Sequence, residues 1–284
     1  MGRKVLSALC SSLLALALVS GCGGGNLDES DAIGAGGSFS CLLQQKEIKC
    51  WGWDHEGRLN SPAGEFIALS TGSAFSCAIN SNRRLQCWGA GVEDMTVPSE
   101  EVIALEVGAF HGCAIEAGSG RPLCFGSNAQ GQSAAPRGVF KTISAGVYHS
   151  CGILENDELR CWGHQLEAFT NPPSGPFRTV SVSNNAACAL DFNDRLQCFG
   201  TSSTVTTPLQ GSFRSLSLGR SFGCALDRED RVHCWGDDSH GQASPPEDRF
   251  HSLSAGSNHA CGITTNGEVR CWGQNHEGQT NPPD

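Results

Sequence analysis

HSLSAG (251–256), HACGI (259–263), VRCWG (269–273) and QNHEGQ (274–279), followed by Pro282 and Pro283, form the last full unit of this chain. The same pattern occurs six more times before it, with more substitutions. Self-similarity at a period of 20–50 residues fixes an architecture before any local pattern does. The sequence therefore predicts a repeat fold, and this unit defines its building block.

The spacing of the cysteines gives the length of the repeat. Apart from Cys10 and Cys22, fourteen cysteines form pairs whose members lie 9 to 11 residues apart, and the first members recur every 36 to 38 residues. This regularity extends over residues 32–284. The seven pairs are Cys41/Cys50, Cys77/Cys87, Cys113/Cys124, Cys151/Cys161, Cys188/Cys198, Cys224/Cys234 and Cys261/Cys271.

Each pair fits one antiparallel hairpin. If the last hairpin is centred on Asn266, Cys261 lies opposite Cys271 and Ile263 lies opposite Val269. Residues two apart in a strand share a face, so these four side chains lie together. Opposite residues are about 4.5 to 5.5 Å apart at Cα, within the reach of a disulfide. We expect one disulfide per hairpin, with buried free thiols as the alternative. Zinc usually needs Cys-x2–4-Cys spacing, which this sequence lacks.

The residue after the second cysteine is always aromatic, and it lies on the face opposite the cysteines. Each hairpin is therefore apolar on both faces, as expected for small sheets that are each buried between two neighbours. A short strand precedes each hairpin, so we predict an all-β, seven-bladed propeller with three-stranded antiparallel blades. The aromatic residues are Trp51, Trp88, Phe125, Trp162, Phe199, Trp235 and Trp272.

A glycine precedes the first cysteine by five residues in six copies, and Ser183 replaces it in the fifth. Glycine there predicts a turn with positive φ or a close backbone approach near the ring axis. Gly-Gln follows the second cysteine in copies three, six and seven, within a proline-containing outer loop. The six glycines are Gly36, Gly72, Gly108, Gly146, Gly219 and Gly256.

The N-terminus predicts export. A basic head precedes an apolar run over 5–19 that is too short for a membrane span and is typical of a secretory signal. The run ends in Val19-Ser20-Gly21-Cys22, which resembles the bacterial lipobox and implies lipidation of Cys22. We expect a signal peptide at 1–21, a flexible tether at 22–31 and the propeller at 32–284. This places the chain, lipid-anchored, in the bacterial cell envelope, at the outer membrane, where disulfides persist. An ordinary signal peptide is the alternative.

Charge limits the partners. The net charge of −10 becomes −12 once Arg3 and Lys4 are removed with the signal. A nucleic-acid partner is therefore not expected. We expect a monomer with no cofactor and no metal, membrane contact only through the lipid anchor, and a protein partner in the envelope or outside the cell.

The motif of the last copy resembles a known family. Ser254-Ala-Gly-x-x-His259-x-Cys261, followed by Cys271-Trp-Gly-x-Asn-x-x-Gly-Gln279, is similar to the regulator-of-chromosome-condensation repeat with cysteines added. The resemblance covers 32–284 and is strongest in copies six and seven. Seven compact copies resemble the bacterial branch that includes the propeller-type β-lactamase inhibitor protein. The resemblance implies a seven-bladed propeller.

The turns after the inner strands vary between copies, and we expect them to surround one mouth of the ring. Phe110, Tyr148 and Arg220 stand out there, because aromatic residues and arginine dominate binding hot spots. Trp53 lies outside the repeated slot and is a fourth candidate. The alternative is that all four are ordinary surface residues.

Three histidines, His111, His149 and His259, occupy a position that holds Phe in other copies. This exchange favours packing over catalysis. Their slot otherwise holds Phe39, Phe75, Ala186 and Phe222.

Three functions remain compatible with the sequence. The first is a non-catalytic, lipid-anchored envelope protein that binds another protein through the ring. The second is an inhibitor of a secreted or periplasmic enzyme. The third is an envelope enzyme with its active site in the axial cleft. No converging set of acid and base residues is apparent, so the first is the prediction and no enzymatic activity is expected.

Overall fold

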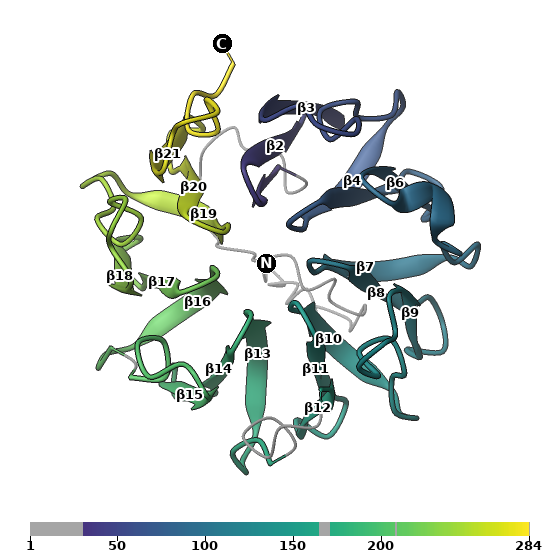
Figure 1. Ribbon diagram of the computed structural model, residues 1–284. Coiled ribbons are helices and arrows are strands. Elements are labelled where there is room, and N and C mark those ends of the chain that lie inside the picture. The colour runs from purple at the N-terminus through teal and green to yellow at the C-terminus, as the bar shows by residue number, and fades with distance from the viewer. Residues whose placement is uncertain (1–30, 165–170, 208, 284) are drawn as a thin grey trace, which may run out of the picture.

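A computed structural model describes residues 31–164, 171–207 and 209–283, and shows seven three-stranded antiparallel sheets arranged as a ring (Figure 1). Each sheet consists of three consecutive strands. The first strand of each blade reaches toward the centre of the ring and the third lies at the periphery. The predicted all-β, seven-bladed propeller with three-stranded blades is confirmed.

The strand bounds repeat from blade to blade. Blades 1 to 4 are β1 (Ala32–Ala35), β2 (Phe39–Gln44) and β3 (Glu47–Gly52); β4 (Phe66–Thr71), β5 (Phe75–Asn80) and β6 (Leu85–Gly89); β7 (Val102–Val107), β8 (His111–Glu116) and β9 (Pro122–Gly126); and β10 (Phe140–Ala145), β11 (His149–Leu154) and β12 (Leu159–Gly163). Blades 5 to 7 are β13 (Phe177–Val182), β14 (Ala186–Asp191) and β15 (Leu196–Gly200); β16 (Phe213–Leu218), β17 (Phe222–Asp227) and β18 (Val232–Gly236); and β19 (Phe250–Ala255), β20 (His259–Thr264) and β21 (Val269–Gly273). A 3-10 turn, η1 (Val92–Asp94), follows β6.

The hairpin register is the predicted one. Cys261 pairs with Cys271 and Ile263 with Val269, and the other six blades repeat this alignment. Seven disulfides join the paired cysteines, one per blade, with Cα atoms 4.0 to 4.1 Å apart, slightly closer than the 4.5 Å expected. The free-thiol alternative is therefore excluded. The bridges are Cys41–Cys50, Cys77–Cys87, Cys113–Cys124, Cys151–Cys161, Cys188–Cys198, Cys224–Cys234 and Cys261–Cys271.

The two cysteines of a pair differ in burial. The first cysteine, on the middle strand, is fully buried in every blade. The second is only half-buried, because it lies on the outer strand, which forms the edge of its three-stranded sheet. Each bridge is therefore protected on its inner side and partly accessible on its outer side. The half-buried cysteines are Cys50, Cys87, Cys124, Cys161, Cys198, Cys234 and Cys271.

The hydrophobic core lies between the blades. The cysteine face of one blade packs against the aromatic face of the next, as where Cys224 and Leu226 of blade 6 contact Trp272 of blade 7. Period-two alternation explains this arrangement, because it places an apolar side chain on each face of the same strand. The prediction that each hairpin packs against a neighbour on both faces is confirmed.

The ring closes by the same packing. Trp51 and Ile33 of blade 1 pack against Cys261 and Ile263 of blade 7, as neighbouring blades do elsewhere. The sheet of blade 7 contains only β19, β20 and β21, and β1 belongs to blade 1. No strand is therefore shared across the closure among the residues described.

Candidate functional site

The axial glycines bring successive blades into backbone contact. A Cβ atom on Gly72 would lie 1.9 Å from the carbonyl oxygen of Gly108, and one on Gly108 would lie 2.0 Å from that of Gly146. The same clash recurs at Gly36, Gly146, Gly219 and Gly256, at 2.3 to 2.7 Å. None of these glycines has positive φ. Of the two expected roles, close approach is right and a left-handed turn is wrong.

Backbone hydrogen bonds connect the blades at this ring of glycines. The N–H of the residue after a glycine donates to the glycine carbonyl of the next blade, as from Ala109 to Gly146 at 3.1 Å. The bond from Ser257 to Gly36, at 3.0 Å, crosses from blade 7 to blade 1. Main-chain contacts therefore hold the blades together at the axis, and the side chains of the turns determine the shape of the mouth.

The turns after the inner strands surround a cavity of about 400 Å³, which we call the mouth cavity. Its floor is the glycine ring and its rim includes Phe110, Tyr148 and Arg220. Phe110 and Tyr148, on adjacent blades, are 47 % and 44 % exposed, and their ring centroids are 6.1 Å apart. Arg220, on blade 6, is exposed and is the only charged residue among the described lining. The mouth is therefore apolar and aromatic on one side and cationic on the other.

Trp53 lies apart from this group. Its backbone N–H donates to the carbonyl of Ser38 at 2.9 Å, its ring stacks on His55 at 4.9 Å, and the Arg58 guanidinium lies 4.5 Å from the ring centroid. It does not line the mouth cavity. The structure brings Phe110 and Tyr148 together and leaves Trp53 in the outer loop of blade 1.

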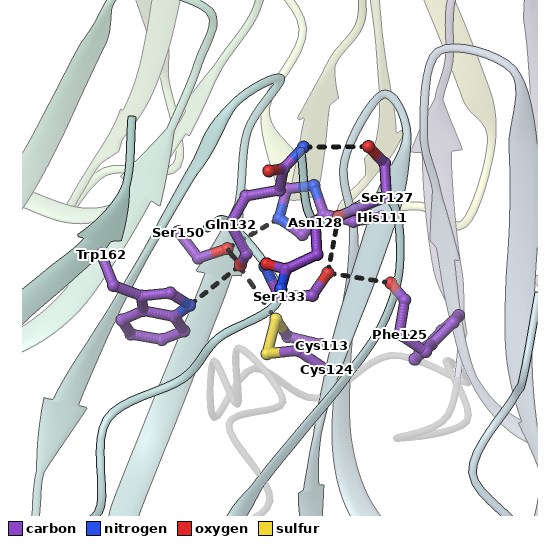
Figure 2. The surroundings of a disulfide bond; sticks show 10 residues. All are labelled: His111, Cys113, Cys124, Phe125, Ser127, Asn128, Gln132, Ser133, Ser150 and Trp162. Atoms are coloured by element: carbon purple, nitrogen blue, oxygen red, sulfur yellow. Dashed lines mark hydrogen bonds between the residues drawn. A yellow bond between two sulfur atoms is a disulfide. The ribbon is translucent and has the colours of Figure 1, made fainter. Parts of the chain in front are cut away.

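A contact that the sequence did not predict joins the outer loops to the next blade. The Gln132 carbonyl accepts a hydrogen bond from the indole of Trp162 at 2.9 Å and one from the hydroxyl of Ser150 at 3.2 Å. Figure 2 shows both groups directed at Gln132, beside the disulfide of blade 3. The side chain of Gln132 is buried and accepts the N–H of Gln130, which fixes the loop. The Gly-Gln pattern was the available signal, but it indicates only a loop.

The same indole contact recurs around the ring and crosses its closure. Gln242 of blade 6 accepts from Trp272 of blade 7 at 3.0 Å, and Gln279 of blade 7 accepts from Trp51 of blade 1 at 2.9 Å. Phenylalanine cannot make this bond, which distinguishes the tryptophan-bearing blades from those with Phe125 or Phe199.

Two buried Ser–His pairs lie at these interfaces. His111 Nε2 lies 2.7 Å from Ser150 Oγ, and His259 Nε2 lies 2.9 Å from Ser40 Oγ. Both serine hydroxyls donate to a backbone carbonyl, so each serine oxygen accepts the histidine Nε2–H. A general base would have to accept the serine proton instead.

The histidines are buried and neutral. Burial lowers the pKa of His111 and of His259 to about 4, and both side chains are fully buried, so substrate cannot reach them. Burial also lowers the pKa of His149 to about 3, with a smaller effect from the neighbouring His111 and His164. Their burial agrees with the packing role expected from the sequence. The bonds to Ser150 and Ser40 add an interblade contact that was not expected.

A second axial cavity of about 340 Å³ opens on the other face of the ring, and we call it the lower cavity. Its lining includes two carboxylates, Asp31 and Glu106. Glu106 lies at the level of Gly34, because both pair with the first cysteine of their blade. Asp31 precedes Gly34 by three residues, or roughly 10 Å along a strand. This offset is wider than the spacing of paired catalytic carboxylates, about 5 to 9.5 Å in glycosidases.

Within the residues described, no group of three or more His, Cys, Asp and Glu side chains could hold a metal ion. The described part of the chain also contains no helix of the length and apolarity that crossing a membrane requires.

Comparison with known proteins agrees with this architecture. A sequence model of the regulator of chromosome condensation (RCC1) repeat matches residues 140–165, 213–242 and 250–279, so blades 4, 6 and 7 carry RCC1 repeats. The resemblance expected from the sequence is confirmed for these three copies. The bacterial inhibitor branch stays a prediction.

Solved structures share the propeller. The ectodomain of the receptor kinase CR4 from Physcomitrella patens is 25 % identical, with a TM-score of 0.73 over 86 % of this chain and 73 % of that one. The CRINKLY WD40 ectodomain of the Arabidopsis thaliana receptor kinase ACR4 is 21 % identical, with a TM-score of 0.72 over 86 % and 97 %. Prp20p from Saccharomyces cerevisiae, described with its binding to Gsp1p and histones, is 14 % identical, with a TM-score of 0.64 over 80 % of each chain.

Proposed function

We propose that this protein is a non-catalytic binding module that holds another protein at its mouth cavity. The observation that carries the proposal is the exposure of Phe110 and Tyr148 side by side on that rim, whereas the phenylalanines on the strands are almost all fully buried. Exposed aromatic pairs beside an arginine match the composition of binding hot spots.

The ring supports the role of a rigid scaffold. Disulfides, axial hydrogen bonds and outer-loop contacts all constrain the blades, so little side-chain or backbone ordering is left to oppose binding. Every blade is packed on both faces within the ring, which supports the expected monomer. Partner binding by an RCC1-type propeller has a parallel in Prp20p, whose reported partners are Gsp1p and histones.

The proposal is tested by replacing Phe110, Tyr148 and Arg220 together with alanine. Truncation of one hot-spot residue costs about 2 kcal/mol or more, so capture of the partner from envelope extracts should fall by at least about tenfold. The matched control is Phe192→Ala, which removes an aromatic side chain that is 55 % exposed on the hairpin of blade 5. That hairpin lies on the opposite face of the ring, so the control should capture the partner as wild type does. Equal recovery of the partner by the triple variant and by wild type would refute the mouth cavity as the binding site.

The compartment follows from the disulfides. Fourteen cysteines joined in pairs are typical of an exported protein in an oxidising environment. We further propose that Cys22 carries a lipid that tethers the ring to the envelope, at the outer membrane, with 1–21 removed and 22–31 as the tether. Cys22 itself lies outside the described residues, and the support is the lipobox-like Val19-Ser-Gly-Cys22.

Lipidation predicts a shift in cell fractionation. Wild-type protein should sediment with membranes, and a Cys22→Ser variant should appear in the soluble fraction. Recovery of both proteins in the soluble fraction would contradict lipid anchoring at Cys22, and it would not bear on binding at the mouth cavity.

An inhibitor of a secreted enzyme is a narrower form of the same binding role.

A further inference from the structure

The described chain enters the ring on the face opposite the mouth cavity, which we call the lower face. Asp31 and Ala32 line the lower cavity only, Ala35 lines both cavities, and Gly36 lines the mouth cavity. The inner strand of blade 1 therefore runs from the lower face toward the mouth. Because strand direction alternates within each blade, the turns between the second and third strands also lie on the lower face.

The length of chain before this point limits where a lipid on Cys22 can lie. Nine residue steps separate Cys22 from Asp31, and even a fully extended chain of that length spans at most about 30 Å. A compact domain of about 250 residues has an outer radius of roughly 23 Å, and a six-residue strand adds about 20 Å of height. A path from the lower face around the edge to the mouth therefore needs on the order of 40 Å. A lipid at Cys22 reaches the lower face but not the mouth, whatever path residues 22–30 take.

On the lower face, basic side chains gather around an exposed aromatic ring in the turn of blade 5. Phe192 is 55 % exposed, and Lys141 Nζ of blade 4 lies 5.6 Å from its ring centroid. Arg195 belongs to the same turn, and Arg228 of blade 6 donates through Nε to Asp194 of this turn at 2.8 Å. We call Lys141, Phe192, Arg195 and Arg228 the lower patch.

The carboxylates of this region are far more buried than the arginines that they accept from. The side chain of Arg195 is 68 % exposed and that of its partner Asp191 only 10 %. For Arg228 and its partner Asp194 the values are 71 % and 11 %. Among the described contacts, both Nη groups of Arg195 and Nη1 of Arg228 have no protein acceptor. The surface that solvent meets here is therefore cationic, although the whole chain is acidic.

From this arrangement we propose that the lower patch binds anionic lipid headgroups, so that the ring lies with its lower face on the membrane and its mouth directed away. Arginine matches phosphate oxygens through its planar set of N–H donors, and basic and aromatic side chains together suit a lipid interface. Exposed carboxylates such as Glu229 also lie on this face, so we expect contact only where a tether holds the ring close to the membrane.

The inference rests on the proposed lipidation of Cys22 and adds an orientation that an anchor alone does not specify. It departs from the expectation that only the lipid touches the membrane. A partner reaches the mouth cavity in this orientation without competing with the membrane.

The test is hydroxyl-radical footprinting of the exported chain, residues 22–284, attached to vesicles through Cys22. The other fourteen cysteines of that chain are joined in disulfides, so a maleimide lipid modifies the Cys22 thiol. Phe192 reports on the lower face, and Phe110 and Tyr148 report on the mouth with similar exposure. On vesicles that contain phosphatidylglycerol, oxidation of Phe192 should fall at least about fivefold relative to the free chain. Oxidation of Phe110 and Tyr148 should not change.

Arg195→Gln combined with Arg228→Gln is the decisive variant. Both side chains are largely exposed, and the carboxylates they leave keep other donors, as where Arg178 donates to Asp194 at 2.9 Å, so the fold should persist. Protection of Phe192 should then be less than about twofold.

The matched control is Lys49→Gln combined with Arg270→Gln, which removes the same charge from exposed side chains on the outer strands of blades 1 and 7. It should keep the protection of Phe192.

Vesicles of phosphatidylcholine alone should protect Phe192 less than about twofold, because they carry no net negative charge. Equal protection on neutral and anionic vesicles, no protection on either, or protection of Phe110 and Tyr148 would overturn the proposal. So would full protection in the Arg195 and Arg228 double variant. Because the lipid is attached chemically, none of these outcomes depends on whether cells lipidate Cys22, which the fractionation of Cys22→Ser tests separately.

Discussion

Reduction of the seven disulfides is expected to unfold the propeller at ordinary temperature. Each bridge closes a loop of about ten residues, which is worth roughly 2.5 to 3 kcal/mol in the chain-entropy model. Seven such bridges total nominally about 19 kcal/mol, more than the 5 to 15 kcal/mol that typically separates a folded domain from its unfolded state. The contributions will not add fully, but even half the sum rivals the whole stability.

Thermal unfolding followed by far-ultraviolet circular dichroism, with and without a phosphine reductant, measures the effect. The half-buried outer cysteines, such as Cys87 and Cys161, give the reductant access to the bridges. The matched comparison is Cys224→Ala with Cys234→Ala, which removes one bridge and should cost about 2.5 kcal/mol while leaving the ring folded. A reduced chain that melts within a few degrees of the oxidised one would show that interblade packing alone sustains the fold.

Gly108→Ala is expected to be among the most damaging single substitutions at the axis. The added Cβ would meet the Gly146 oxygen at 2.0 Å, its carbonyl carbon at 3.0 Å and the carbonyl carbon of Ala145 at 3.2 Å. All three atoms are backbone of the next blade, so no side chain can rotate away. Overpacking in a rigid interior typically costs 1 to 3 kcal/mol and occasionally more, and we expect about 3 kcal/mol or above. In a domain of this size that lowers Tm by roughly 6 to 12 °C.

Gly118→Ala separates this clash from the general effect of replacing glycine. Gly118 has a φ of +81° in the hairpin turn of blade 3, with nothing within 4 Å of an added Cβ. Alanine there should cost only the backbone strain, about 1 to 2 kcal/mol. Equal losses of Tm in the two variants would mean that the axial contact contributes nothing of its own.

The fold was predictable because its signals are local and repeated. Two cysteines 9 to 11 residues apart, with aliphatic residues two positions inside them, specify the hairpin register without knowledge of any other blade, as Cys261/Cys271 and Ile263/Val269 show. The spacing of 11 residues between Cys113 and Cys124 lengthens that hairpin without changing its register, since Ile115 pairs with Pro122. Seven repeats then left few alternatives to a ring.

The contacts between blades were not predictable in the same way. Gln132 and Trp162 are 30 residues apart, and their bond depends on how blades 3 and 4 are rotated relative to each other. Glu106 likewise gives no signal in Ala104-Leu-Glu-Val107, because only the strand register shows that the residue opposite the first cysteine is serine or glycine in the other six blades. Phe110, Tyr148 and Arg220 were found because they vary where the scaffold requires nothing, and the structure places all three at one rim.

The closure between blade 7 and blade 1 has a consequence for how the gene product could be rearranged. Trp51 binds Gln279 as Trp272 binds Gln242, and Ser257 bonds to Gly36 as Ala109 bonds to Gly146. Since the closure between blade 7 and blade 1 makes the same contacts as the other pairs of neighbouring blades, the polypeptide could start in any outer loop once its present ends were linked. Circular permutants cut there would keep every disulfide within a continuous segment.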